Sequence, residues 1–326
     1  MRRRDFLKRA GGVAATAALP MPAMAQSAST FPNRAITLQC AFPAGGSADL
    51  LMRAMGEIAG KHLGQSIIID NKTGGAGTAA AATMAATAKP DGYTIAQLPI
   101  TVFRLPHMQK MSFDPLKDFT YIIHVTGYVL GVFAKADGPF KTWADVVDYA
   151  KANPGKVTYA SSGPGGTPHL GMEQIAARAG IKFTHVPMKG GSESSAAMLG
   201  GHVMLQADST TVKPLVDAGQ ARALMVWTAE RTKFWPNVPT LKDLGYPLAY
   251  ESPYGFAGPK GMDPAVVQKL HDAFKVALEH PSVQSILSKF DKIALYKNSA
   301  DYTAFAATLS QQEKDAVEKL GLGKKD

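Results

Sequence analysis

The sequence predicts an α/β fold built as two lobes, and three observations support this prediction. After Phe31, apolar runs of about four to eight residues alternate with amphipathic segments, which is typical of a mostly parallel sheet covered by helices. The same order of elements starts again near Val129. The chain has 326 residues, 46% of them hydrophobic, which is enough for two such cores.

The first lobe is predicted to contain residues 31–127 and 250–326. Its first helix carries apolar residues at spacings of three and four, and Gly64 is expected to end it. An alanine-rich helix is expected over Thr78–Ala88. The expected strands of this first part are Ile36–Ala41, Ser66–Asp70 and Tyr93–Leu98.

The second lobe is predicted to contain residues 128–249. Thr142 is expected to cap a helix at its start, and the turn Asn153–Gly155 leads into the next strand. The expected strands, with helices between them, are Val157–Ala160, Phe183–Val186, His202–Ala207 and Ala221–Trp227.

The last third of the chain is predicted to return to the first lobe. Asp263 and Pro264 form an N-cap followed by a proline in the first helical position, so a helix is expected from there to about residue 279. Two more helices should follow, the last over Ser299–Leu320. A chain that leaves and returns needs two crossing strands, which we place at Tyr121–Phe133 and Leu248–Ala257. No low-complexity linker separates the lobes, so these short crossings suit a hinge that closes on a ligand.

The first 25 residues have the features of a twin-arginine signal peptide. Arg3–Lys8 is a twin-arginine run, and the apolar stretch Ala10–Leu19 is shorter than the roughly 20 residues of a membrane helix. Ala23–Ala25 supplies the pattern of small residues before a cleavage site. The alternative, a basic amphipathic helix, is disfavoured by the two prolines that follow the apolar stretch. We expect export to the periplasm and cleavage near Ala25 and Gln26.

The charge of the chain argues against nucleic acid as a partner. The formal net charge is +9, of which about +5 remains after the predicted cleavage. The lysines are scattered, and no stripe of arginines and aromatic residues is present. A mild positive field of this kind would steer small anions toward the protein.

The sequence contains no recognisable catalytic or metal-binding motif. It lacks the nucleophile elbow, the HExxH helix, the Walker loop and the dinucleotide fingerprint, and its eight histidines show no metal-ligand spacing. The only cysteine, Cys40, lies in an apolar run without a neighbouring base, so a buried structural thiol is expected. We therefore expect neither catalysis, nor a metal, nor a cofactor.

Two glycine-rich turns, Phe42–Asp49 and Ser161–His169, are the main candidates for a binding site. Each follows an expected strand and opens an expected helix, which places free backbone N–H groups and the positive end of a helix dipole at one sheet edge. Such an arrangement holds an anion without a cationic side chain. Either turn alone could be a plain strand–helix connection. One in each lobe, at the edge where α/β sheets bind ligands, favours a cleft for a carboxylate.

Several polar side chains could complete the site, each with a second interpretation that stays open. Thr101 and Asp208 follow expected strands, and Asp208 could accept a hydrogen bond from the ligand or cap the next helix. His169 could donate to a carboxylate or lie on a helix surface. Lys189 could be a counter-charge or a solvated loop residue. Asp49 could do no more than favour the start of its helix through the dipole.

A series of motifs along the chain resembles the Bug family, the TctC-like substrate-binding subunits of tripartite tricarboxylate transporters. The resemblance covers essentially the whole chain after the signal peptide. In order, the segments that carry it are Phe42–Asp49 (FPAGGSAD), Asp70–Gly77, Lys89–Thr94, Asp114–Phe119, Ala152–Leu170, Val186–Ser209 and Ala218–Gly245.

The resemblance implies a type II-like periplasmic-binding-protein fold, with two mixed sheets flanked by helices, two crossing strands and a central cleft. It implies a small mono-, di- or tricarboxylate as ligand, aromatic acids included, held by backbone amides and ordered waters. It also implies one large and one small integral membrane subunit as partners, and we expect a monomer. A ligand-sensing subunit for a membrane kinase is the alternative role, and a periplasmic enzyme is a weaker one.

Carried over to this chain, the resemblance implies that Phe42–Ser47 with Asp49 form one side of the cleft and Ser161–Thr167 with His169 the other. It also implies that Asp208 corresponds to the acidic loop residue of the family. This chain departs from the family pattern at Ala44, Ser47 and Ala48 and at Pro164 and Pro168, which suggests a more apolar lining. The expected ligand-binding residues are Phe42, Pro43, Ala44, Gly45, Gly46, Ser47, Asp49, Thr101, Ser161, Ser162, Gly163, Gly165, Gly166, Thr167, His169 and Asp208.

Overall fold

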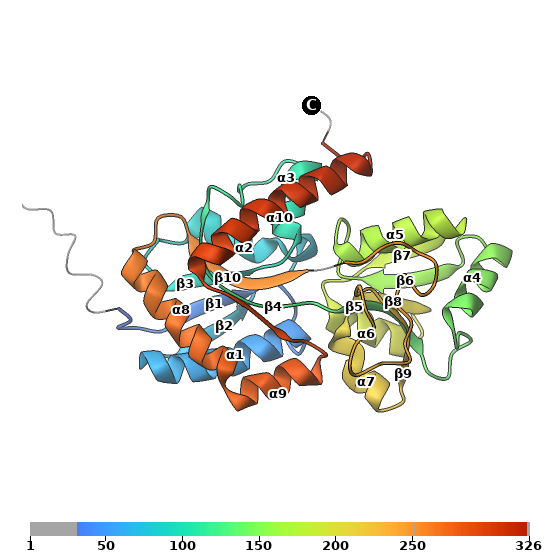
Figure 1. The fold of residues 1–326 in the computed structure, drawn as a ribbon, viewed down its shortest axis with the longest axis horizontal. Helices are drawn as coiled ribbons and strands as arrows, with labels where there is room; N and C mark the ends of the chain where they lie inside the picture. Colours follow the sequence, from blue (N-terminus) through green and yellow to red (C-terminus); the bar gives the residue numbers. More distant parts are fainter. Residues whose placement is uncertain (1–30, 251, 325–326) are drawn as a thin grey trace, which may run out of the picture. The chain divides into compact units, whose positions relative to one another are not determined.

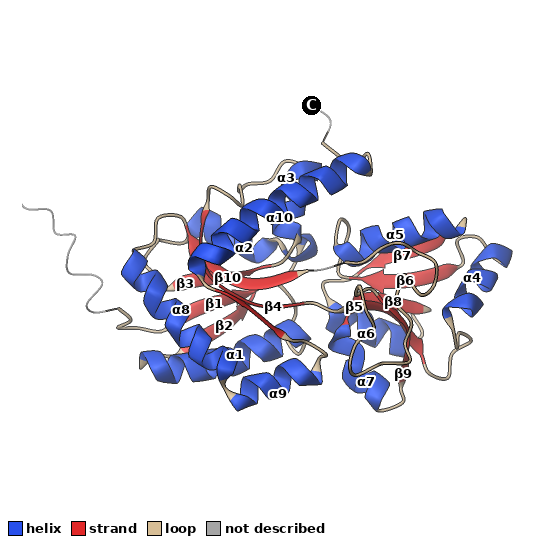
Figure 2. Ribbon diagram, in the orientation of Figure 1, coloured by secondary structure: helices blue, strands red, loops and turns tan. Residues whose placement is uncertain are grey.

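Two mixed sheets organise the part of the chain that the computed structural model describes, residues 31–250 and 252–324 (Figure 2). In spatial order, the larger sheet contains β11 (Ala294–Lys297), β4 (Phe119–Gly127), β10 (Pro253–Pro259), β3 (Thr94–Leu98), β1 (Ile36–Cys40) and β2 (Ile67–Asn71). The smaller contains β7 (Phe183–Pro187), β6 (Val157–Ser161), β8 (Leu205–Ser209), β5 (Leu130–Lys135) and β9 (Ala221–Val226). Both belong to one compact unit.

Each sheet has a parallel part that carries a glycine-rich turn at its edge. In the larger sheet β1 pairs in parallel with β2 and β3, and β10 runs antiparallel between β3 and β4. In the smaller sheet β6 pairs in parallel with β7 and β8, and β5 runs antiparallel between β8 and β9. Because parallel strands end at the same edge, the turns after β1 and β6 share that edge with the ends of β3 and β8.

Helices cover both faces of the larger sheet (Figure 1). One face carries α1 (Ser47–Leu63), α8 (Pro264–Glu279) and α9 (Pro281–Lys289). The other carries α2 (Ala79–Thr87), α3 (Thr101–Met108) and α10 (Ser299–Lys319), after the short 3-10 turn η1 (Gly75–Gly77). Phe103 and Tyr302 are fully buried in the core beneath this second group, because their helices present one apolar stripe to the sheet.

The smaller sheet is covered in the same way. One face carries α4 (Trp143–Ala152) and α5 (Thr167–Ala179), and the other carries α6 (Gly191–Leu199), the 3-10 turn η2 (Thr210–Val212) and α7 (Lys213–Asp217). On the α6 side, Phe133 and Val226 are buried beneath Met198. Alternate strand residues therefore face two separate cores, which explains why these strands read as continuous apolar runs.

The two crossings differ in detail from the predicted strands. The predicted strand Tyr121–Phe133 is two strands, β4 in one sheet and β5 in the other, with Tyr128 and Val129 between them. The predicted strand Leu248–Ala257 was wrong at its start, because β10 begins at Pro253. The Tyr250 N–H instead donates to the Trp227 carbonyl in the other lobe, outside the sheet ladder that β10 joins.

The helix ends that were predicted from a capping side chain or a glycine are confirmed. Gly64 adopts a left-handed conformation (φ 70°) after α1, Thr142 forms a capping box with Asp145, and the Asp263 side chain caps α8. The sequence reading missed α3 and the short strand β11. It also placed β8 about two residues too early.

The predicted fold class is confirmed by this architecture, whereas the lobe limits at 127/128 and 249/250 stay a prediction. The predicted signal peptide, residues 1–25, lies outside the described residues. Among those residues, no helix is long and apolar enough to span a membrane.

Candidate functional site

A cavity lies between the two sheets and draws its walls from both lobes. The space between its lining residues is about 570 Å³, counting the part that opens to solvent. Its lining residues are Phe42, Pro43, Gly46, Ser47, Ala48, Ala76, Pro99, Ile100, Thr101, Tyr128, Leu130, Ser162, Gly166, Thr167, Pro168, Gly191, Ser192, Asp208, Ser209, Thr211 and Ser252.

Four helices begin at this cavity, twice the number predicted. The first residues of α1, α3, α5 and α6 line it, and each of these helices begins without a hydrogen bond from an N-cap side chain. The N-cap is glycine at Gly46, Gly166 and Gly190. Because glycine offers no side-chain acceptor, the first N–H groups of these three helices have no cap from their own N-cap side chain, and the positive dipole ends lie at the cavity. Of these N–H groups, that of Ser47 donates to Thr211, and Pro168 has none.

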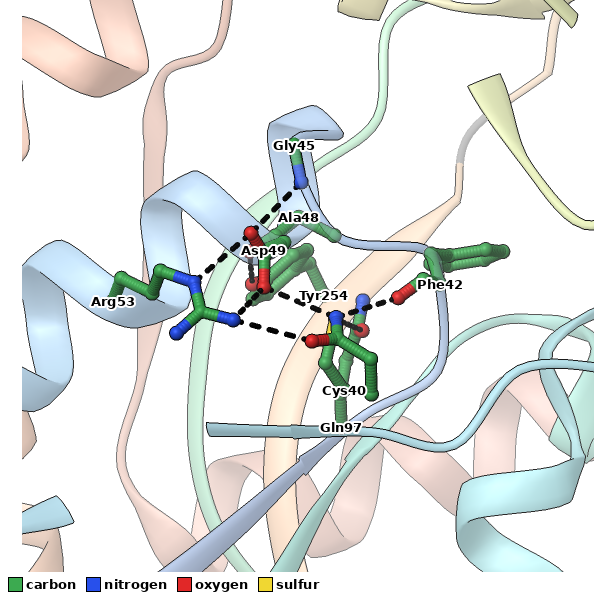
Figure 3. A network of polar contacts seen from close by, with 9 residues as sticks. Cys40, Phe42, Gly45, Ala48, Asp49, Arg53, Gln97 and Tyr254 are labelled. Atoms are coloured by element: carbon green, nitrogen blue, oxygen red, sulfur yellow. Dashed lines mark hydrogen bonds and ion pairs between the residues drawn. The ribbon is translucent and has the colours of Figure 1, made fainter. Parts of the chain in front are cut away.

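The first glycine-rich turn is held from behind by Asp49 (Figure 3). Its carboxylate accepts hydrogen bonds from the Gly45 N–H (2.9 Å), from Arg53 (3.0 Å) and from the Asn71 amide (3.0 Å). Asn71 also donates to the Phe42 carbonyl. Burial alone would raise the pKa of Asp49, but these hydrogen bonds outweigh it and hold the pKa below its ordinary value. Asp49 therefore shapes the turn rather than lining the cavity.

The same region explains the buried thiol of Cys40. Its Sγ lies 3.9 Å from the Gln97 amide oxygen, and burial raises the pKa of the thiol to about 12 (Figure 3). The cysteine is free and buried, so its predicted structural role is consistent with its surroundings. Gln97 also donates to the Tyr128 hydroxyl and fixes this residue of the cavity wall.

The second glycine-rich turn is braced by a pair of histidines. The Nδ1 atom of His169 accepts a hydrogen bond from the Gly165 N–H at 3.2 Å, and its ring lies 4.4 Å from the ring of His185. His185 in turn contacts the Ser161 hydroxyl at 2.8 Å. Burial lowers the pKa of both histidines, that of His185 to about 4, so both rings are neutral at pH 7. His169 does not line the cavity.

Direct contacts join the two lobes around the cavity. The Thr211 hydroxyl donates to the Ser47 side chain at 3.0 Å and accepts from its backbone N–H at 3.3 Å. Arg104, on α3, donates to the Thr167 hydroxyl of α5 at 2.9 Å and is paired with Glu313 in the buried interior. A Cβ atom at Gly190 would lie 2.6 Å from Pro43 of the other lobe. The lobes are thus in close contact over the site.

Asp208 is the one carboxylate on the lining, and it is 4% exposed. It lies within β8 rather than after it, and the N-cap of the following η2 turn is Ser209, so the interpretation of Asp208 as an N-cap was wrong. Burial raises the pKa of Asp208 to about 6, and hydrogen bonds from the Ser209 N–H and the Ser194 hydroxyl limit that rise.

The remaining wall is apolar. The Phe42 ring lies edge-on to the Tyr128 ring at 5.9 Å, and Ile100 and Leu130 complete an apolar surface on one side of the cavity. The Thr101 hydroxyl donates to the Ala76 carbonyl at 2.8 Å, so only its acceptor sites remain for a ligand.

Nine of the predicted site residues line the cavity and seven do not. Those on the lining are Phe42, Pro43, Gly46, Ser47, Thr101, Ser162, Gly166, Thr167 and Asp208. Those away from it are Ala44, Gly45, Asp49, Ser161, Gly163, Gly165 and His169. Lys189, the candidate counter-charge, is exposed and also absent from the lining.

The main residues that sequence reasoning missed are at the N-terminus of α6 and in the crossing. Gly191 and Ser192 are the first residues of α6, and the pair Gly190 and Gly191 at the start of this helix was a signal that could have identified a third turn. Tyr128 carried no local signal. In the described part of the chain, no cluster of His, Cys, Asp and Glu has the arrangement of a metal site.

Comparison with known proteins adds to this geometry. Residues 51–322 match the family described as "Tripartite tricarboxylate transporter family receptor". A Cupriavidus necator protein, described as "UPF0065 protein in gbd 5'region", is 49% identical over 99% of this chain and 99% of its own length. The structure of periplasmic binding protein BugD matches with a TM-score of 0.85 and 26% identity, covering 90% of this chain and all of that one. R. palustris Rpa4515, solved with adipate, matches with a TM-score of 0.83 and 27% identity, covering 90% of this chain and 99% of that one.

Proposed function

Because the chain belongs to the tripartite tricarboxylate transporter receptor family, a family of periplasmic solute-binding proteins, we propose that it captures a small carboxylate between its lobes and delivers it to a transporter of that type. The transporter partners are one large and one small integral membrane subunit. The protein acts as a monomer in the periplasm, after cleavage between Ala25 and Gln26. It binds its ligand without converting it.

The observation that carries this proposal is the meeting of four helix N-termini at one cavity. The lining contains no lysine, arginine or histidine, so the attraction for an anion comes from backbone N–H groups and helix dipoles. Hydroxyls of Ser162 and Thr167 add donors at the same edge. The adipate complex of Rpa4515, which has the same fold, supports a carboxylate as the ligand class.

The apolar wall and Asp208 narrow the choice of acid. Phe42, Ile100 and Leu130 favour an aliphatic or aromatic body, because burial of apolar area contributes to affinity. An ionised Asp208 would repel a second carboxylate placed beside it, and would accept a hydrogen bond from a ligand hydroxyl or amine.

The experiment that tests the proposal is a binding screen of the purified mature protein. We would record thermal unfolding with adipate, malate, succinate, citrate, benzoate and 4-hydroxybutyrate, and measure Kd by calorimetry for each acid that stabilises the protein. At least one acid should raise the melting temperature, because a ligand that binds only the folded state stabilises it by mass action. Product analysis after prolonged incubation should return the unchanged acid.

Neutral analogues provide the matched control. Adipamide and benzamide keep the bodies of adipate and benzoate but lack the negative charge, so they should bind far more weakly than the acids. The proposal fails if none of the six acids binds, if the amides bind as well as the acids, or if an acid is turned over.

A further inference from the structure

A lysine ammonium lies behind one wall of the cavity. Lys292, in the loop between α9 and β11, is only 4% exposed. Its Nζ atom donates to the Gly127 carbonyl at 3.2 Å and lies 4.0 Å from the centre of the Tyr128 ring. Tyr128 lines the cavity whereas Lys292 does not, so the ring links the ammonium to the site.

Among the described residues, Lys292 has no carboxylate partner at close range. None of the ion pairs within 4.0 Å that the described residues form includes it. Burying an ammonium without such a partner costs stability, and groups held at such a cost concentrate at functional sites. Two other cations near the turns differ, since the buried Arg104 is paired with Glu313 and the half-exposed Arg53 with Asp49.

The loop that carries Lys292 is hydrogen-bonded to both lobes. The Thr210 hydroxyl, in the second lobe, donates to the Phe290 carbonyl, and the Thr126 hydroxyl of β4 donates to the Ile293 carbonyl at 2.6 Å. With the bond to Gly127, these contacts anchor the loop on either side of Lys292. The ammonium therefore keeps its position beneath Tyr128.

The charged and titratable groups that surround Lys292 belong to several elements. Asp291 precedes it, and Asp208, on β8, acts on it electrostatically; both charges limit the effect of burial, which lowers the pKa of Lys292 to about 7. Lys213 and Asp217, on α7, act on Asp291. The pKa values of the phenols of Tyr128 and its neighbour Tyr254 are raised by burial, so these side chains stay neutral.

We propose that Lys292 is a positioning residue for the bound acid, because its ammonium behind Tyr128 supplies the positive charge that the cavity lining lacks and offsets the charge of Asp208. This inference rests on the proposed function, since it requires a bound carboxylate. On this proposal, Lys292 contributes to the affinity for the acid although it lies outside the cavity. Its contribution adds to that of the helix N-termini.

The test measures the pH dependence of binding in three variants. Calorimetric Kd values would be recorded from pH 7 to pH 9, a range in which Asp208 stays ionised, for every one of the six acids that binds the wild-type protein. Lys292→Arg keeps the charge throughout, and Lys292→Met removes it. Lys289→Met is the matched control, because Lys289 lies on α9 with its side chain exposed and its loss changes the net charge equally.

In the wild-type protein and in Lys289→Met, affinity should fall by about tenfold from pH 7 to pH 9 as Lys292 loses its proton. Lys292→Arg should keep its pH 7 affinity up to pH 9. Lys292→Met should bind about tenfold more weakly at pH 7, with little further change. The inference is overturned if Lys292→Met binds like the wild type, or if Lys292→Arg shows the same loss at high pH.

A spectroscopic measurement separates this role from a purely structural one. In protein labelled with ¹³C at the lysine Cε atoms, the resonance missing from Lys292→Arg should titrate near pH 7, and addition of a binding acid should move that titration to higher pH. An unchanged titration would overturn the inference while leaving the proposed function intact. If none of the six acids binds the wild-type protein, both the proposed function and this inference are wrong.

Discussion

The Nη1 atom of Arg104 lies 2.9 Å from the hydroxyl oxygen of Thr167, so one hydrogen bond ties α3 of the first lobe to α5 of the second. Thr167 lines the cavity. Because Arg104 fills an acceptor site of this oxygen, the hydroxyl hydrogen is free to point toward a ligand. The same guanidinium is neutralised by Glu313, so it orients a wall residue without adding net charge.

Replacing Arg104 should therefore have two separable effects. Arg104→Met leaves the carboxylate of Glu313 buried and unpaired, which should lower the free energy of unfolding by about 3–5 kcal/mol. Arg104→Met combined with Glu313→Leu removes both charges and should recover most of that loss in urea unfolding. Both variants lack the bond to Thr167, so both should bind the acid about tenfold more weakly. Wild-type affinity in the double variant would show that this bond is unimportant for binding.

Gly190 offers a test of lobe contact at a position that does not itself line the cavity. A Cβ atom there would lie 2.6 Å from Cδ of Pro43, and overpacking of this kind costs about 1–3 kcal/mol. If the lobes separate in the empty protein, the cost falls on the closed form alone, so Gly190→Ala should weaken acid binding about tenfold with little change in melting temperature. Adding Pro43→Ala removes the opposing atom and should restore affinity. An unaffected Kd in Gly190→Ala would mean that the lobes need not meet here.

Substitutions at Gly46, the N-cap of α1, can separate the effect of a negative charge on binding from the effect of helix capping. Gly46 has extended backbone angles (φ −76°, ψ 165°) that suit Asp or Asn, and a Cβ atom there would lie 3.3 Å from the Pro43 carbonyl oxygen, so Gly46→Asp and Gly46→Asn should carry the same steric cost in the free energy of unfolding. Either side chain can take up the first N–H groups, but only Asp adds a negative charge. In calorimetry, Gly46→Asp should bind the acid at least about tenfold more weakly than Gly46→Asn. Equal affinities would remove this helix end from the site.

The stability of the protein should depend on pH through Asp208. Its pKa in the folded protein is about 6, above the 3.8 of an unperturbed side chain, so the folded state holds the proton more tightly and the free energy of unfolding falls as pH rises from about 4 to about 6. The loss amounts to about 3 kcal/mol. Asp208→Asn lacks this group, so denaturant unfolding at pH 4, 5, 6 and 7 should show its advantage over the wild type growing across that window. A constant difference would contradict the raised pKa.

The strand–turn–helix units were predictable because their signals are local. Gly46 and Gly166 stand between a buried strand and a helix, and their capping positions follow from the neighbouring residues alone. Asp49 and His169 show the limit of that reasoning. The sequence places each of them beside its turn, but only the fold shows that their side chains hold the turn from behind.

Other parts of the site depend on distant contacts and left little trace in the sequence. Pro106 inside α3 argued against a helix, yet α3 supplies Thr101 and Arg104. Tyr128 reads as one more apolar residue of a crossing strand, although the strand breaks there. Lys292 reads as a surface lysine, because its burial comes from the contacts of its loop with β4 and with Thr210 of η2, which lie far away in the sequence.

The use of main-chain amides at four helix ends has a consequence for how this protein could acquire new ligands. Nearly every amino acid carries a backbone N–H, so substitutions seldom remove the means of holding an acid. The opposite wall consists of side chains such as Phe42, Ile100 and Leu130, and each substitution there changes the shape of the space. Substitutions in this wall can thus change which acids fit the cavity, while the backbone groups that bind the carboxylate stay the same. Laboratory evolution of altered specificity should accordingly begin with libraries at these three positions.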